Sequence, residues 1–198
     1  MNAGTRSGGH IRVVSESRRE SIASNGVVGM LLFVAAEAMF FAGFISAFTI
    51  VRAGSMVWPP PGQPRLPVEA TAFNTLVLLA SAGCLIWARR AFNHDRGSAK
   101  KPLTLAMALG AFFVVFQGAE WVAMLGQGLT LTSSTLGSFF YLIVGVHALH
   151  VIAALAVLGY TWRRLQRGWL VSSQLATAEV FWYFVVGVWP VLYLTVYL

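Results

Sequence analysis

Long apolar stretches alternate with short polar segments along the whole chain. A helix that crosses a membrane needs about 20 mostly apolar residues, and five stretches reach that length. We expect spans at about residues 26–51, 70–89, 103–125, 136–160 and 175–197. Residues 1–25 are polar and contain arginine, glycine and serine, which predicts a tail outside the membrane. The pattern therefore predicts an all-α integral membrane protein, with five transmembrane helices in one bundle over residues 26–198.

The composition and the placement of charge support this interpretation and give it a direction. Of the 198 residues, 57% are hydrophobic and only 11% are charged, which is too few for the surface of a soluble domain. All of the 14 lysines and arginines except Arg52 and Arg65 precede the first span or lie in the second-to-third and fourth-to-fifth connections. Because such an excess marks the cytoplasmic side, we expect a cytoplasmic N-terminus and a periplasmic C-terminus. The net charge of +7 is then a topology signal, and nucleic acid is not an expected partner.

Glu37 stands in the middle of the first apolar stretch, and its partner is central to any functional reading. A charged side chain at the centre of a bilayer costs about 2.5–3.5 kcal/mol even on lenient scales, so it usually faces protein or a cavity. His147 and His150 are three residues apart on the fourth span, at a comparable depth. Two interpretations remain open: a hydrogen-bonded bridge between the first and fourth helices, or a group that contacts lipid or handles protons.

The helix contacts of the first span are expected on a stripe of small residues. Such residues let the backbones of membrane helices approach closely. The stripe comprises Ala35, Ala38, Ala42, Gly43, Ser46 and Ala47. Glu37 lies beside it, so we expect the carboxylate in a helix contact or at its edge.

Further polar groups in the spans predict hydrogen bonds between helices. Asn74 opens the second span, and Gln117 and Glu120 lie three apart on one face of the third. Trp58 precedes three consecutive prolines in the first connection, which predicts a stiff outer loop with an interfacial tryptophan. That loop is interpreted as a rigid connector or as a docking surface for another subunit. Pro190 should kink the fifth helix or be accommodated by its neighbours.

We expect no catalytic residue, metal or cofactor in this chain. The two histidines within the spans lie on one face of one helix, which cannot supply both sides of a haem. A copper or di-iron site would need more converging histidines or carboxylates. The single Cys84 lies within a span, where a small buried residue is the simplest interpretation.

Several segments together resemble the cytochrome c oxidase subunit III family of the haem-copper respiratory oxidases, in its short five-helix form. They follow the family order over all five spans: Gly29–Ala47, Trp58–Gly62, Phe73–Gly83, Phe116–Glu120, Gly137–Phe140, His147–Val151 and Trp182–Trp189. In this resemblance Glu37, His147 and His150 correspond to the intramembrane acid and paired histidines of the family. Glu120 corresponds to the glutamate of its Gln-x-x-Glu motif.

The resemblance implies a non-redox subunit of a proton-pumping terminal oxidase. Haem and copper would belong to subunits I and II, with subunit I as the main contact. The family's subunit III supports proton uptake, protects the catalytic subunit during turnover and holds phospholipid. We expect a bacterial inner membrane, with an organellar inner membrane as the alternative.

The chain also departs from the family pattern at its last helix. Tyr183 and Val186 stand where the family usually has histidine and aspartate, and Ser133 or Ser134 stands near a common outer-loop aspartate. An accessory subunit of a quinol oxidase or of a nitric oxide reductase is therefore an alternative. A small proton-coupled transporter is a third, although the sequence shows neither the internal repeats nor the broken helices of that class.

Overall fold

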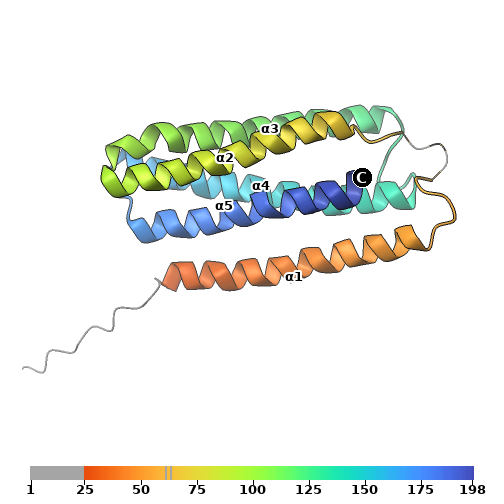
Figure 1. Ribbon diagram of the computed structural model, residues 1–198, viewed down its shortest axis with the longest axis horizontal. Helices are drawn as coiled ribbons and strands as arrows, with labels where there is room; N and C mark the ends of the chain where they lie inside the picture. Colours follow the sequence, from red (N-terminus) through yellow and green to blue (C-terminus); the bar gives the residue numbers. More distant parts are fainter. Residues whose placement is uncertain (1–24, 61, 63) are drawn as a thin grey trace, which may run out of the picture.

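The structure, a computed structural model, describes residues 25–60, 62 and 64–198, so the expected N-terminal tail lies outside the described residues. In the described part, five long helices run side by side, as the hydropathy pattern predicts, and all are apolar enough to cross a membrane (Figure 1). Their bounds are α1 Asn25–Ala53, α2 Val68–His94, α3 Lys100–Gly126, α4 Thr135–Gln166 and α5 Ser172–Leu192. A 3₁₀ turn, η1 (Gly97–Ala99), precedes α3, and a π-helical turn, η2 (Tyr193–Tyr197), continues α5. The helices α1 to α4 extend beyond their expected spans at both ends, whereas α5 begins earlier than expected and reaches the expected end only together with η2.

Four of the helices form the bundle, and α1 lies along one side of it. The α2 helix packs on α3, and α4 packs on both α3 and α5. The α1 helix contacts mainly α5, with a smaller contact to α4, and it lies away from α2 and α3 (Figure 1). Successive helices reverse direction, so the start of α1 and the α2–α3 and α4–α5 connections share one end (Figure 1). The basic residues of both connections therefore gather at that end; its cytoplasmic location stays a prediction.

Two tryptophans of α5 form the centre of the bundle. Trp182 and Trp189 are fully buried, and their indole nitrogens donate hydrogen bonds to Ser81 Oγ at 2.9 Å and Thr75 Oγ1 at 2.8 Å on α2. Gly110 of α3 makes room for the first indole. A Cβ atom at that position would lie 2.5 Å from the Trp182 ring. The large ring and the missing side chain thus fit together and fix how closely α3 and α5 approach.

The small-residue stripe of α1 does not make the helix contact that the sequence predicts. All six of its residues are exposed, whereas Phe41 and Phe48, seven residues apart, are buried against the bundle. Phe41 and Phe48 follow the other face of the helix, so α1 packs on the bundle through bulky rings and not through the small-residue stripe. Ala38 and Ala42 instead border a groove of about 390 Å³ between α1 and α5.

The end of α5 accommodates Pro190 without a break in the helix. Proline lacks the backbone N–H that an α-helix needs, and the chain widens into η2 three residues later. Arg52 of α1 reaches this turn, where its guanidinium donates to the carbonyl oxygens of Thr195 at 3.2 Å and Leu198 at 3.0 Å. The arginine at the end of α1 therefore partners carbonyls at the end of the last helix.

An exposed carboxylate stabilises the turn between α2 and α3, so the stability of this turn should depend on pH. Asp95 Oδ2 accepts hydrogen bonds from the backbone N–H and the hydroxyl of Ser98, each at 2.8 Å. These bonds, led by the one from the Ser98 hydroxyl, hold the pKa of Asp95 below its ordinary 3.8. A carboxylate with a lowered pKa stabilises the folded turn above pH 3.8, and this contribution is lost as the pH falls through the lower folded value.

We therefore expect the Ser98 amide to exchange its hydrogen faster, relative to the intrinsic rate, as the pH drops below 3.8. Hydrogen exchange with mass spectrometry measures this. Asp95→Asn should remove the pH step, and a step that persists in that variant would assign it to another group.

Candidate functional site

The carboxylate of Glu37 is bridged to the fourth helix. Glu37 Oε2 lies 3.1 Å from His150 Nε2, and the two side chains are 22% and 16% exposed. The other ring nitrogen, His150 Nδ1, lies 2.9 Å from the carbonyl oxygen of Val146, one turn back on α4. The Phe41 ring packs edge-on against the imidazole at 5.4 Å between centroids. The pair lies at the α1–α4 contact and ties the peripheral helix to the bundle.

The hydrogen bonds of His150 determine how many protons the pair holds. A carbonyl oxygen only accepts, so Nδ1 must carry a proton and donate it to Val146. A neutral imidazole of that tautomer has a bare Nε2, which cannot donate to Glu37. The 3.1 Å contact is then satisfied either by a protonated Glu37 that donates to Nε2, or by an imidazolium beside a carboxylate. In both forms Glu37 and His150 share one extra proton between them.

His147 does not join Glu37, although the sequence places it at a similar depth. The side chain is 1% exposed, and its ring stacks on Trp189 with 5.1 Å between centroids. Neither ring nitrogen has a hydrogen-bond partner among the described residues. Three residues turn an α-helix through about 300°, which leaves the two side chains about 60° apart around the helix axis. His147 therefore faces α3 and α5, while His150 faces α1. The two histidines therefore belong to different environments.

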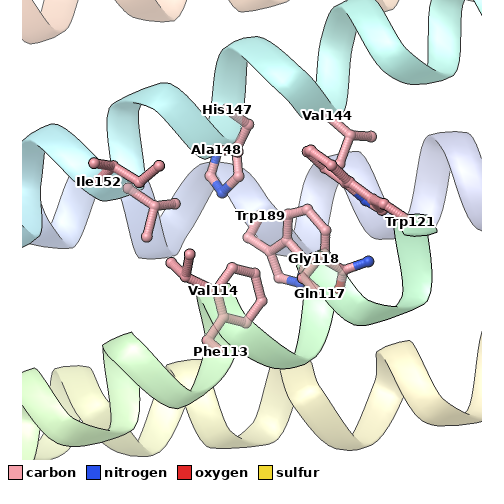
Figure 2. A pocket seen from close by; sticks show the side chains of 11 residues that line it. Phe113, Val114, Gln117, Gly118, Trp121, Val144, His147, Ala148, Ile152 and Trp189 are labelled. Atoms are coloured by element: carbon pink, nitrogen blue, oxygen red, sulfur yellow. The ribbon is translucent and has the colours of Figure 1, made fainter.

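The His147 ring enters a cavity between α3 and α4, with α5 behind it (Figure 2). The volume is about 230 Å³. Its wall is mostly aromatic and aliphatic, from residues that include Phe113, Val114, Val144, Val151 and Trp189.

Asn74 and Gln117 are brought together in a buried network. Asn74 Nδ2 donates to Gln117 Oε1 at 3.3 Å and to the carbonyl oxygen of Phe113 at 3.1 Å. Gln117 Nε2 in turn donates to the hydroxyl of Tyr197 at 3.0 Å. The three groups link α2, α3 and η2, and they stabilise the half of the bundle away from the basic connections, because unpaired polar groups in a membrane are unfavourable.

In the described part of the chain, Glu120 and Trp58 form no hydrogen bond with this network. Glu120 is half-buried near the end of α3, and within the described residues no hydrogen bond joins its carboxylate to a neighbouring helix, contrary to expectation. Trp58 is half-buried and packs edge-on against Phe48 at 5.6 Å, which holds the proline-rich loop on the end of α1.

A further polar pair was not singled out from the sequence. Glu179 of α5 is 7% exposed, and its Oε2 lies 3.8 Å from Arg89 Nη1 of α2. Arg89 also donates to the carbonyl oxygen of Ser172 at 3.0 Å, which joins α2 to the start of α5. The sequence did contain a signal for this pair, since Arg89 lies at the end of one predicted span and Glu179 near the start of another, both on the side of the basic connections. Knowing that α2 and α5 are neighbours was needed to pair them.

The described residues contain no cluster of three or more histidine, cysteine, aspartate or glutamate side chains that could hold a metal ion. Taken together, the fold and the site define a polytopic helical membrane protein whose polar side chains lie between helices.

Comparison with known proteins places it more narrowly. Residues 7–198 match the pattern of the family described as cytochrome c oxidase subunit III. A cytochrome c oxidase subunit 3 from Synechocystis is 32% identical over 175 residues, which cover 86% of this chain and 74% of that protein. That of Loxodonta africana is 33% identical over 208 positions, which cover 100% and 75% respectively. That of Xenopus laevis is 35% identical over 179, which cover 85% and 67%. The chain belongs to the cytochrome c oxidase subunit III family.

Proposed function

We propose that this chain is a non-redox subunit of a haem-copper terminal oxidase in a bacterial inner membrane. It would pack on the catalytic subunit, hold phospholipid and support proton uptake while that subunit reduces oxygen to water. Haem and copper would be carried by partner subunits. The observation that carries this proposal is the family match over nearly the whole chain.

The outward face of α1 supports a role in assembly. Large apolar side chains are exposed along the whole helix, among them Leu32, Met39 and Ile50, each about 70% exposed. In a membrane such a face contacts lipid or another subunit. The groove between α1 and α5, about 390 Å³ in volume, is lined by apolar residues and has the character of a site for lipid acyl chains.

The pair of Glu37 and His150 supports a role in proton handling. It holds one extra proton in either of its bonded forms, and both side chains keep some exposure at the edge of the bundle. Its bond to α4 also keeps α1 in place, so the structural and the protonic interpretations can both hold.

The purified oxidase with and without this chain tests the proposal. We expect both preparations to show the same haem spectrum, because no haem ligand is lost. The preparation without the chain should lose oxygen-reduction activity faster over successive turnovers. If the chain never co-purifies with a haem-copper subunit, or if the haem spectrum disappears with it, the proposal is wrong.

A conservative variant separates proton handling from packing. In Glu37→Gln the amide can still donate to His150 Nε2, so assembly should be retained while the shared proton is lost. We expect a normal haem spectrum with a shorter turnover lifetime. Glu69→Gln, at the exposed start of α2, removes a carboxylate that has no such partner among the described residues, and it serves as the matched control. Equal lifetimes in the two variants would contradict the protonic role.

A further inference from the structure

The end of the bundle that carries the basic connections has more positive charge than its acids can balance (Figure 1). Eight described lysines and arginines lie there: Arg89, Arg90, Arg96, Lys100, Lys101, Arg163, Arg164 and Arg167. The described residues place two acids at this end. Asp95 accepts hydrogen bonds from Ser98, and Glu179 lies beside Arg89. Seven of the eight cations therefore have no ion-pair partner within the described part of the chain.

Two of these cations line one pocket, between the α2–α3 and α4–α5 connections. Its volume is about 190 Å³. Arg96 and the half-buried Lys100 contribute to the wall from the first connection and the start of α3, and Gln166 contributes from the end of α4. The buried side chains of Leu165 and Leu170 border it as well. The pocket therefore presents two positive charges, and no acidic side chain is among the described residues that line it.

The two cationic side chains are suited to a phosphate group. The Arg96 guanidinium lies over the Phe92 ring, 5.6 Å from its centroid. Its planar fork of N–H groups can bond two oxygens of one phosphate, and the Lys100 ammonium adds a compact charge. Because α3 begins at this pocket and α4 ends there, the opposite ends of the two helix dipoles roughly offset each other. The side-chain charges therefore determine the sign of the ligand, which is an anion.

A shallow apolar furrow begins at the same lysine and follows the exposed face of α3. Its volume is about 400 Å³, and it is lined by Lys100, Lys101, Thr104, Leu105 and Ala108. These residues share one face of the helix over a rise of about 12 Å. Leu105 is 44% exposed, and Phe112, two turns further along the same face, is 45% exposed. A soluble anion leaves this apolar surface bare, whereas the acyl chain of a lipid covers it.

Aromatic side chains indicate the depth of this site in the membrane. Tryptophan and tyrosine are enriched at both membrane–water interfaces. Trp87, Tyr160 and Trp169 are all more than half exposed near this end of the bundle. The indole nitrogen of Trp162 donates to Thr104 Oγ1, within the furrow, at 2.9 Å. The pocket thus lies at the level of lipid headgroups, and the furrow leads from it toward the hydrocarbon.

We propose that the pocket and the furrow together bind one phospholipid of net negative charge. Its phosphate contacts Arg96 and Lys100, and an acyl chain lies along Leu105 and Ala108. Basic pockets between membrane helices hold such headgroups. The site lies on α3, away from α1, and is therefore separate from the α1–α5 groove (Figure 1). The inference rests on the lipid-holding part of the proposed function and adds a location and a preference for charge.

Photoreactive lipids test the site on the full chain in phosphatidylcholine vesicles. A trace of phosphatidylglycerol or of phosphatidylcholine carries the same diazirine-bearing acyl chain. We expect phosphatidylglycerol to label the peptide of residues 100–115 roughly five- to thirtyfold more, because each of the two cations attracts anionic lipid about fivefold. Equal labelling by the two lipids overturns the proposal. Soluble glycerol phosphate, which has the charge but no acyl chain, should not compete. If it competes as well as unlabelled phosphatidylglycerol, the site binds a free anion and the proposal is wrong.

Charge variants decide whether the pocket or the general charge of this end selects the lipid. Arg96→Gln and Lys100→Gln should each lower the preference for phosphatidylglycerol about fivefold. Arg90→Gln removes the same charge from an exposed position of α2 that does not line the pocket, so it should leave the preference unchanged. An equal loss in all three variants contradicts a specific pocket.

A bulky side chain in the furrow tests the place of the acyl chain. Ala108→Trp should abolish the labelling of residues 100–115, whereas Ala119→Trp, at another exposed position of α3, should retain it. Labelling that survives Ala108→Trp refutes the acyl-chain placement. These measurements follow lipid contact with this chain alone. A negative result therefore leaves the role in an oxidase intact, and failure to co-purify with a haem-copper subunit leaves the labelling unchanged.

Discussion

Gly110→Ala is expected to destabilise the helix bundle by about 1–3 kcal/mol, the usual effect of overpacking a close-packed interior. The new Cβ would lie 2.5 Å and 2.8 Å from two atoms of the Trp182 ring and 3.0 Å from a methyl carbon of Leu155. The indole cannot turn away, because it is fully buried and its nitrogen is bonded to Ser81. The α3 helix must therefore move away from α5, which opens the centre of the bundle.

The thermal unfolding midpoint of the purified chain in detergent measures this effect. For a chain of this length we expect it to fall by roughly 2–10 °C. Gly118→Ala is the matched control on the same helix, since its Cβ would meet no atom within 4 Å. That control should leave the midpoint unchanged or raise it slightly, because alanine favours helix over glycine. A fall of equal size in both variants would show that helix propensity, and not contact with Trp182, determines the result.

The number of helices could be predicted from the sequence because membrane spans follow from length and hydropathy alone. The face of α1 that packs on the bundle could not be predicted, because every face of α1 is apolar and hydropathy does not distinguish them. The stripe from Ala35 to Ala47 was expected to face the bundle, and Phe41 and Phe48 do so instead. The face that packs on the bundle depends on the shapes of the side chains on α4 and α5, which lie far from α1 along the chain.

The polar groups show the same division between local and long-range information. Glu37 was recognisable as an unusual acid from its own neighbours in the sequence, and the depth of each span suggested a histidine partner. The choice of His150 over His147 depends on the rotation of α4, and hydropathy does not determine it. The α3–α4 cavity was out of reach, because it is the space that side chains from three helices fail to fill.

His150→Leu should destabilise the chain far more than Glu37→Leu does. The first change leaves an acid without its partner in a membrane-spanning helix, which costs about 2.5–3.5 kcal/mol at the bilayer centre and somewhat less for a group that keeps some exposure. The second leaves only a neutral imidazole nitrogen unpaired, which costs about 1 kcal/mol. Replacement of both residues by leucine should recover most of the stability, because no unpaired polar group remains.

Equilibrium unfolding is measured in mixed micelles for the unaltered chain, the two single leucine variants and the double variant. The four free energies of unfolding give the coupling energy between Glu37 and His150. We expect the double variant to be more stable than His150→Leu alone. His147→Leu is the control for the loss of a histidine from α4, and it should be tolerated because its nitrogens have no hydrogen bond with the described protein. If the changes in the free energy of unfolding of the two single variants add up to that of the double variant, the 3.1 Å contact does not contribute to stability.

The stable double variant can then separate the two interpretations of the pair. It keeps α1 on the bundle through Phe41 and Phe48 but holds no shared proton. If an oxidase that contains it assembles normally and inactivates early during turnover, the pair acts through its proton. If its lifetime matches that of the unaltered complex, neither the shared proton nor the bond between Glu37 and His150 affects turnover. Because the double variant has no unpaired charge, neither outcome can be attributed to a destabilised subunit.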